Sequence, residues 1–350
     1  MLFINSIFGI ILKPVFIILS ALIIIALNSF IFNSVQAIEL DDPKQLQAFI
    51  TEMSTKHQFD SKYLTTLFEK TKKRQSILDA ITRPAEGKPW YDYRPIFVTN
   101  KRINGGIDFL AENSSILKSA FKKYGVPPEI IVSIIGVETR YGTNIGSYPV
   151  IDSLSTLAFA YPPRSTFFKS ELEHFLLMTR DEKLDPLEQT GSYAGAMGMP
   201  QFMPSSYREY AVDFNNDGSR NLWTNHHDVI GSISNYFVRH GWKKDQPIVT
   251  KVKVYGNRYT ELLSKNMKPK WSQKELLLHG VALPEGLPKD LKGSFMSFET
   301  KNGPEYWVGW NNFYVITRYN HSILYAMSVY QLSEYIRNKE QAKKYLPAPA

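Results

Sequence analysis

The chain contains no cysteine among its 350 residues. This absence excludes disulfide bonds, thiolate metal sites, cysteine nucleophiles and a lipid-modified N-terminal cysteine. The stability of the fold must therefore come from packing. With 43% hydrophobic and 13% aromatic residues, the chain is long and apolar enough to bury a large core.

Clustered positive charge is also lacking. The formal net charge is +8, but Lys and Arg are spread along the chain without a polybasic tail, so no nucleic acid partner is predicted. A spread basic excess suits an anionic polymer such as a cell wall, and simple solubility is the alternative. A phosphate loop is absent too, because no Lys-Ser/Thr pair follows the glycines of Gly191–Gly198.

The N-terminal segment is unlike the rest of the chain. Met1–Ala37 has one charge, Lys13, ahead of the apolar run Val15–Phe32, and it ends in Val35-Gln36-Ala37. This pattern predicts a secretory signal peptide that is cleaved after Ala37. The apolar run is close to the length that crosses a bilayer, so an uncleaved membrane anchor is the alternative. Either way, the body of the protein is expected to be exported.

Helical periodicity dominates the chain after the signal. Two helices are predicted within Asp42–Ala80, and further helices cover much of residues 105–240. Thr82–Val98 holds three prolines among aromatic residues, and we expect an irregular cleft wall or a packed loop there instead of a regular helix. Alternating Val and Lys over Ile248–Tyr255 indicates a small β region, and a last helix is predicted at Ile323–Ile336.

One carboxylate lies on a strongly apolar helix. In the stretch Pro127–Gly142, Glu138 continues the face formed by Ile131, Ile134 and Ile135, at the spacing i, i+3, i+4 and i+7. Desolvation and the negative end of the helix dipole should both raise its pKa, as suits a general acid. The alternative is a solvated Glu138, or one that is paired with Arg140.

Two further segments offer polar groups for a ligand. Gly191–Tyr207 is rich in glycine and proline, and its Ser192 and Gln201 are neutral groups of the kind that bind sugar hydroxyl and N-acetyl groups. A tight core turn is the alternative. Arg164 follows two prolines at a helix entry, where its guanidinium could bind a carboxylate or a sugar oxygen, or could lie on the surface.

A calcium-loop pattern begins at Asp213. Its first seven positions match an EF-hand loop, with oxygen side chains at positions one, three and five and a glycine at six. Position twelve is Thr224, which cannot be the bidentate acid. Either the loop is enlarged and Asp228 closes it, or the segment is a polar turn. The candidate ligands are Asp213, Asn215, Asp217, Ser219 and Asp228.

Five sequence motifs occur together in one order. They are VETRYG, YPPRSTFF, GSYAGAMG with QFMPSSY two residues later, the Asp-Asn-Asp-Gly loop, and TRYNHSILYAMSV. Over about Asp42–Arg337 they closely resemble the family B lytic murein transglycosylases. The resemblance implies a mainly α (α+β) fold, in which a lysozyme-like helical catalytic core carries a flanking helical domain and a small inserted β domain.

The resemblance also implies a division of the chain into domains. After the signal at 1–37, the helical domain covers 38–100 and is completed by the C-terminal helix. The catalytic core with its EF-hand-like loop covers 101–245, the β domain 246–312, and a cleft segment with the last helix 313–350.

The resemblance assigns roles to particular residues. Glu138 corresponds to the single catalytic acid and base, and Ser192 and Gln201 to residues near the sugar at the cleavage point. The calcium ligands are the five candidates given above, although the spacing from Trp223 to Asp228 is a residue longer than in the family. Further cleft positions are matched by Arg164, Tyr236, Tyr319, Asn320, Tyr325 and Tyr93.

The implied reaction cleaves peptidoglycan between N-acetylmuramic acid and N-acetylglucosamine without water and leaves 1,6-anhydromuramoyl ends. It needs no cofactor for its chemistry, and calcium would be structural. A monomer in the periplasm is expected, with glycan strands as substrate and cell-wall synthesis or remodelling proteins as possible partners. The alternatives are a hydrolytic lysozyme-type muramidase, which would use water on the same fold, and a non-catalytic peptidoglycan-binding protein.

Overall fold

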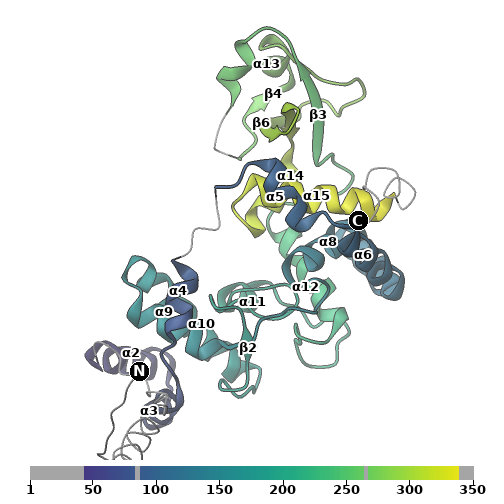
Figure 1. The fold of residues 1–350 in the computed structure, drawn as a ribbon. Coiled ribbons are helices and arrows are strands. Elements are labelled where there is room, and N and C mark those ends of the chain that lie inside the picture. Colours follow the sequence, from purple (N-terminus) through teal and green to yellow (C-terminus); the bar gives the residue numbers. More distant parts are fainter. Residues whose placement is uncertain (1–42, 83–86, 264–266, 339–350) are drawn as a thin grey trace, which may run out of the picture.

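The computed structural model of the chain describes residues 43–82, 87–263 and 267–338. The signal peptide and the alternative anchor predicted for Met1–Ala37 lie outside these ranges. Within the ranges, no helix has both the length and the apolar character needed to span a bilayer. Helices make up most of the structure and one small sheet lies at one end (Figure 1), which confirms the predicted fold class.

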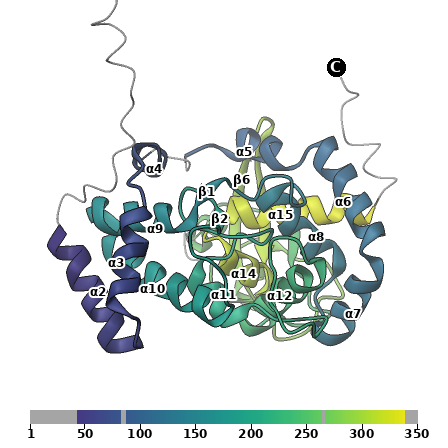
Figure 2. The same cartoon turned by 90° about the horizontal axis from the view of Figure 1, so that it is seen from below.

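The N-terminal helices pack against a helical pair from the middle of the chain. Three helices form where two were predicted, because the chain is interrupted after His57 and again after Lys70. The Asp60 carboxylate caps the second helix by accepting from the backbone N–H of Lys62 at 2.9 Å. These elements are α2 (Pro43–His57), α3 (Ser61–Lys70) and α4 (Gln75–Ile81), with α9 (Val150–Ala160) and α10 (Ser165–Asp181) as their partners (Figure 2).

The proline-rich segment contains a regular helix, α5 (Trp90–Phe97), so the expectation of irregular structure throughout Thr82–Val98 was wrong. Pro89 occupies the N-cap position, where the helix needs no N–H donor. Pro95 removes only one hydrogen bond from the last turns, and the N–H of Val98 still bonds to the carbonyl of Arg94 at 2.9 Å. Packing of the buried Trp90 ring compensates for the lost bond.

Helix α8 lies at the centre of the remaining helices. Its sequence is apolar all round, and every residue from Ile130 to Val137 is buried. α15 and α6 form its most extensive helix contacts, and α7 and α12 also pack on it (Figure 1). The central helices are α6 (Asn100–Glu112), α7 (Ser114–Tyr124), α8 (Pro128–Thr139), α12 (His226–Arg239), α14 (Asn311–Tyr319) and α15 (Ile323–Arg337), with the short α11 (Pro204–Tyr210) beside them.

A five-stranded antiparallel sheet has its own small core around Leu262, Leu276 and Trp310. The strand order is β4-β6-β7-β3-β5, and the hairpin of β6 and β7 is the longest pairing. The strands are β3 (Val249–Val254), β4 (Trp271–Ser272), β5 (Val281–Ala282), β6 (Lys292–Thr300) and β7 (Gly303–Gly309), and α13 (Gln273–Leu278) lies between β4 and β5.

The spatial grouping of the helices differs from the linear order of the chain. The C-terminal helix α15 packs on α8, α6, α14 and α5, whereas α4 packs on α9. The Phe49 ring of α2 likewise contacts the Phe159 ring of α9, with centroids 5.9 Å apart. Among helices α2 to α5, α5 therefore has the most extensive contact with α15.

Candidate active site

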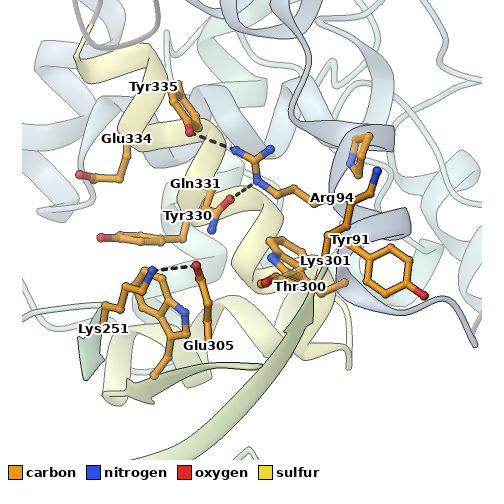
Figure 3. Close-up of a pocket in the computed structure, with 13 residues that line it drawn as sticks. Tyr91, Arg94, Lys251, Thr300, Lys301, Glu305, Tyr330, Gln331, Glu334 and Tyr335 are labelled. Atoms are coloured by element: carbon orange, nitrogen blue, oxygen red, sulfur yellow. Dashed lines mark hydrogen bonds and ion pairs between the residues drawn. The ribbon is translucent and has the colours of Figure 1, made fainter. Parts of the chain in front are cut away.

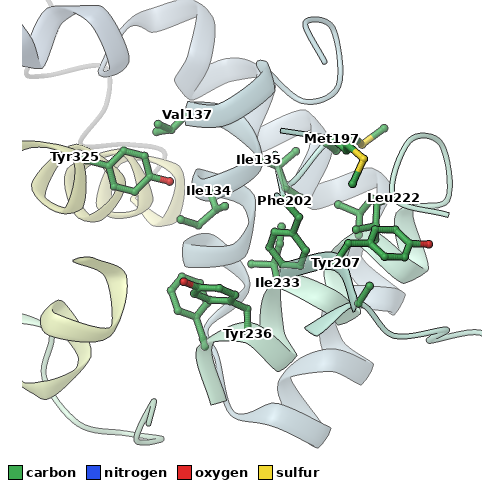
Figure 4. Close-up of a cluster of buried hydrophobic side chains, with 14 of the residues drawn as sticks. Ile134, Ile135, Val137, Met197, Phe202, Tyr207, Leu222, Ile233, Tyr236 and Tyr325 are labelled. Carbon is green, nitrogen blue, oxygen red and sulfur yellow. The ribbon is translucent and has the colours of Figure 1, made fainter. Parts of the chain in front are cut away.

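Helix α8 carries Glu138 to its C-terminal end. Ile131, Ile134 and Ile135 are fully buried, as their shared face predicted, and Figure 4 shows Ile134 and Ile135 among the buried side chains around Phe202 and Tyr236. Glu138 itself is only half-buried. Its carboxyl group is thus attached to a rigid, close-packed helix while part of the side chain stays accessible to a ligand.

The carboxyl group of Glu138 is in an environment that favours its protonated form. Burial raises the pKa of Glu138 to about 7, and a hydrogen bond from the Tyr325 hydroxyl, 2.5 Å from Oε1, acts in the opposite direction. This confirms the predicted increase. Arg140 is exposed, and none of its described contacts is with Glu138, so the alternative of an ion pair between them is not supported.

A second carboxylate is missing from this environment. The causes of the Glu138 pKa shift are burial and the Tyr325 hydrogen bond, and in the described part of the chain no Asp or Glu contributes to the shift. Glycosidases with two catalytic carboxylates hold them about 5 to 9.5 Å apart, where their charges interact. The electrostatic environment of Glu138 is therefore set by burial and by the Tyr325 hydroxyl, and no neighbouring carboxylate charge is among its causes.

The turn after Glu138 has an uncommon backbone. Arg140, Tyr141 and Gly142 all have positive φ angles, of 51°, 61° and 86°. The Tyr141 ring lies between α6 and α8, where a Cβ added to Gly105 or Gly136 would come within 2.9 Å or 2.5 Å of its side-chain atoms. Glycine at these two positions leaves the space, here called the Tyr141 slot, that the ring fills. No sequence pattern predicted this slot.

Hydrogen bonds hold this turn in place. The Tyr141 hydroxyl donates to the carbonyl oxygen of Arg102 at 2.6 Å, and burial raises the pKa of Tyr141. Thr139 Oγ1 lies 3.1 Å from the Met199 carbonyl oxygen and accepts from the N–H of Gly142. The end of α8 is thereby tied both to α6 and to the glycine-rich segment.

Three of the predicted cleft tyrosines converge on Glu138. Tyr325 contacts it directly, and after burial the Glu138 charge is the next cause that raises the pKa of Tyr319. Tyr319 donates to the Pro200 carbonyl oxygen at 2.5 Å and packs on Tyr236 with ring centroids 4.9 Å apart. Tyr93 contributes to the raised pKa of Tyr325, and it therefore lies near the Tyr325 hydroxyl that contacts Glu138.

Ser192 and Gln201 lie in the tight turns of the glycine-rich segment. Ser192 Oγ accepts from the N–H of Ala196 at 3.0 Å. Gln201 has a positive φ of 52°, and its side-chain amide donates to the carbonyl oxygens of Ile145 and Gly198 at 3.1 Å and 2.9 Å. Both side chains remain partly exposed, so each could also meet a ligand.

The structure does not bring Arg164 and Asn320 into the group around Glu138. Arg164 is exposed, with its guanidinium over the Phe167 ring at 4.4 Å from the centroid. Asn320 is exposed just after α14, and its carbonyl oxygen accepts from the N–H of Ser322 at 2.7 Å. Neither residue has a described contact with Glu138, so their predicted roles in the cleft stay predictions.

Asp228, the residue predicted to close an enlarged calcium loop, lies in the first turn of α12. It is fully buried, and its two carboxylate oxygens accept from the N–H groups of Phe214 at 2.9 Å and Asn221 at 2.8 Å. Burial raises the pKa of Asp228, and the charges of Asp217 and Asp213 add to the increase. Asp213 and Asp217 are thus close enough for their charges to act on Asp228, although the three carboxylates as described are not arranged to hold a metal ion.

The other candidate ligands mostly bond within the loop. Asp213 accepts from the N–H groups of Asp217 and Gly218, and Asp217 accepts from Asn215 and Ser219. Among the residues described, no three His, Cys, Asp or Glu side chains are arranged to hold a metal ion. The oxygen donors suit calcium, and a divalent cation would relieve the repulsion among the carboxylates.

Comparisons with known proteins agree on one family. The family model described as "Transglycosylase SLT domain" matches residues 41–334. The chain is 43% identical to the membrane-bound lytic murein transglycosylase B of Escherichia coli over 298 residues, which cover 82% of this chain and 81% of that protein.

Solved structures extend the match to the whole fold. A soluble lytic transglycosylase from Pseudomonas aeruginosa is 49% identical with a TM-score of 0.81, covering 85% of this chain and 99% of that one. An Escherichia coli lytic transglycosylase, solved with bulgecin A and with calcium, is 41% identical with a TM-score of 0.80, covering 87% and 96%. By these matches in sequence and in its lysozyme-like helical fold, this chain belongs to the family B lytic murein transglycosylases, enzymes of peptidoglycan cleavage.

Proposed function

We propose that Glu138 is the single general acid and base of a non-hydrolytic cleavage between N-acetylmuramic acid and N-acetylglucosamine. The observation that carries this proposal is a lone carboxyl group whose pKa burial raises to about 7. A group with that pKa exists in both protonation states near neutral pH, so it can give a proton and take one back. The Tyr325 hydroxyl orients the carboxylate through its 2.5 Å hydrogen bond.

The reaction then has two proton transfers. Protonated Glu138 donates to the glycosidic oxygen, the C1–O bond breaks, and the N-acetyl carbonyl oxygen of the muramoyl residue stabilises C1. The Glu138 carboxylate next takes the proton of the C6 hydroxyl, whose oxygen bonds to C1 and displaces the N-acetyl oxygen. The products are a 1,6-anhydromuramoyl end and a free N-acetylglucosamine hydroxyl, and Glu138 regains its proton. Acid and base catalysis of this kind contributes roughly a hundredfold to ten-thousandfold in rate.

The other cleft residues would bind the sugars. We propose that Ser192 and Gln201 meet hydroxyl or N-acetyl groups, and that Tyr93, Tyr236 and Tyr319 form an aromatic wall. For the tyrosines, support comes from the effect of the Glu138 charge on Tyr319, the packing of Tyr236 on Tyr319 and the effect of Tyr93 on Tyr325. Arg164 and Asn320 would act only at the outer parts of a long substrate, because both are exposed.

Digestion of purified sacculi in water labelled with heavy oxygen tests the proposal. We expect muropeptides that end in anhydromuramic acid, lighter by one water than hydrolytic products and free of label. Labelled reducing ends would identify a hydrolytic muramidase instead. Tight binding to sacculi without any soluble product would identify a non-catalytic binding protein.

The pH dependence should report the protonation of Glu138. Because the first step needs the acid form, kcat/KM should fall as pH rises above about 7. Tyr325→Phe removes a hydrogen bond that favours the carboxylate, so the pKa of Glu138 should rise and the alkaline limb should move up by roughly one pH unit. Tyr63→Phe, the same change at an exposed tyrosine of α3, serves as the control. If the alkaline limb of the kcat/KM profile does not move in Tyr325→Phe, the role assigned to the Tyr325 hydroxyl is wrong.

We also propose a structural calcium ion at Asp213, Asn215, Asp217, Ser219 and Asp228. Support comes from the three neighbouring carboxylates, with Asp228 buried at the start of α12, and from the calcium complex of the Escherichia coli relative. The ion would join the loop to α12 and take no part in the chemistry. The extra residue between Trp223 and Asp228 predicts a modest affinity.

Calcium should raise the melting temperature of the wild-type protein in a concentration-dependent way, because the ion would bind only the folded loop. Asp217→Ala should remove this increase and leave cleavage activity. Asp79→Ala, an exposed aspartate on α4, is the matched control and should keep the increase. If the melting temperature of the wild-type protein changes with neither calcium nor a chelator, the site is excluded.

Export and assembly remain part of the proposal. We propose a periplasmic enzyme released by cleavage after Ala37, because Val35-Gln36-Ala37 follows the apolar run as in a signal peptide. A lipid anchor is excluded separately, since the chain has no cysteine. We further propose that it acts as a monomer on glycan strands and has the domain division predicted above, except that α15 joins α5 and the central helices, whereas α2 and α4 pack on α9. A related Pseudomonas aeruginosa enzyme, solved with NAG-NAM-pentapeptide, supports peptidoglycan as the substrate.

A further inference from the structure

A groove of about 880 Å³ lies where the sheet meets α5 and α15. Figure 3 shows side chains from all three parts pointing into it, among them Arg94 of α5, Lys251 of β3 and Tyr330 of α15. Neither Glu138 nor any of its predicted cleft partners lines this groove. It is therefore a second concave surface, which the proposed chemistry does not use.

Aromatic rings form much of the groove. Trp90, Tyr91, Trp307, Tyr330 and Tyr335 line it, and the Trp307 and Tyr330 rings meet edge to face with centroids 6.3 Å apart. Ring faces and edges of this kind bind the apolar surfaces of sugars and of peptide side chains at a small cost in side-chain entropy. The groove thus suits an extended, partly apolar ligand.

Arg94 gives the groove a fixed cation. Its Nε donates to Gln331 Oε1 at 2.6 Å and its Nη2 donates to the Tyr335 hydroxyl at 3.0 Å (Figure 3). A guanidinium has five N–H groups, so these two bonds fix its orientation and leave donors for a ligand. An oriented guanidinium is well suited to a carboxylate.

Lys301 adds a second cation at the turn between β6 and β7. It is exposed, and it forms no ion pair among the residues described. The remaining charges are largely balanced, since Lys251 pairs with Glu305 at 2.7 Å and Glu334 pairs with Arg337 at 2.9 Å. Arg94 and Lys301 therefore remain as the charges available to an anionic ligand.

We propose that this groove binds the peptide arms of peptidoglycan, with a peptide carboxylate at Arg94 and Lys301 and the peptide chain along the aromatic rings. A peptide attached to the glycan by its N-terminus ends in a carboxylate, which matches the two cations. The proposal rests on peptidoglycan as the substrate of the family and does not depend on the role of Glu138. It assigns the sheet a function, which is to hold the cross-linked wall while the cleft acts on a glycan strand.

Binding to sacculi tests the groove separately from catalysis. Binding of the Glu138→Gln protein to intact sacculi is measured by sedimentation, and its binding to the fluorescently labelled glycan strands that an amidase releases from sacculi is measured in solution by anisotropy. Adding Lys301→Glu or Arg94→Gln should raise the Kd for intact sacculi roughly threefold and leave the Kd for the peptide-free strands unchanged. The difference should vanish at high salt, because exposed charges are then screened.

Lys118→Glu on α7 is the matched control, since it makes the same charge change at an exposed lysine outside the groove. It should leave both Kd values unchanged. The inference is overturned if Lys301→Glu and Arg94→Gln have no effect on intact sacculi, or if they weaken binding equally with and without peptides. Sedimentation needs no turnover, so either outcome leaves the cleavage reaction to be judged by product analysis.

Discussion

Glu138→Gln should abolish turnover of sacculi, with a loss of at least about a thousandfold in kcat/KM. The amide keeps the size and polarity of the side chain and can still accept a hydrogen bond from Tyr325, but it cannot transfer a proton. The measurement is the rate of release of soluble muropeptides. Glu129→Gln, the same change in the first turn of the same helix, is the control and should stay active.

The same variant should be more stable than the wild type above neutral pH. The pKa of Glu138 is about 7 in the folded protein because of burial, against an ordinary value of 4.5. Between these values the folded protein binds a proton that the unfolded chain has released, so wild-type stability falls as pH rises through this window. Gln avoids this loss, which is about 3 kcal/mol by pH 8. Equal melting temperatures at pH 4 and a higher one for Glu138→Gln at pH 8 would show it, while an active Glu138→Gln protein would refute the catalytic assignment.

Gly136→Val should both destabilise the protein and impair catalysis. Even the first added carbon would lie 2.5 Å from the Tyr141 hydroxyl oxygen, and the slot is closed on its other side by α6. Overpacking of this kind costs about 1 to 3 kcal/mol. Because Glu138 is two residues further along α8, a shift of this helix end should also lower kcat/KM by roughly a hundredfold, as misplaced catalytic groups do.

Gly231→Val is the matched control for this prediction. Gly231 lies in α12, and a Cβ added there would come within 2.7 Å of the side chain of Phe214, which precedes this helix, while no atom of Glu138 or Tyr141 is among its nearest contacts. Thermal unfolding should show similar losses in the two variants, whereas the activity per folded molecule should fall much further in Gly136→Val. Equal activities would mean that the Tyr141 slot supports the fold without positioning Glu138.

Local patterns predicted much of the helical part. The isoleucine spacing around Glu138 was sufficient to place that residue inward, because helical periodicity and burial of an apolar face are properties of one segment. The segment Thr82–Val98 shows the limit of such patterns. Its prolines argued against a helix, yet α5 forms because Trp90 packs on Phe298 of the sheet, with ring centroids 5.3 Å apart.

The site depends on contacts that no local pattern contains. The Tyr325 hydroxyl reaches Glu138 across 187 positions of sequence, and the Tyr141 slot needs glycines from two helices. Isolated glycines in helical segments, such as Gly105, Gly106 and Gly136, were the available signal, but their common partner could not be read from their positions.

The sequence by itself determined the absence of disulfides, the mainly helical class, the inward carboxylate and the order of motifs that marks the family. Each of these depends on residue type or on short periodic spacing. Only the tertiary structure decided that the Tyr325 hydroxyl bonds to Glu138, that Arg164 and Asn320 lie outside its described contacts, and that α5, the sheet and α15 form a groove. The physical reason is that burial, hydrogen-bond partners and concave surfaces arise where distant segments pack together, and packing is set by the whole chain.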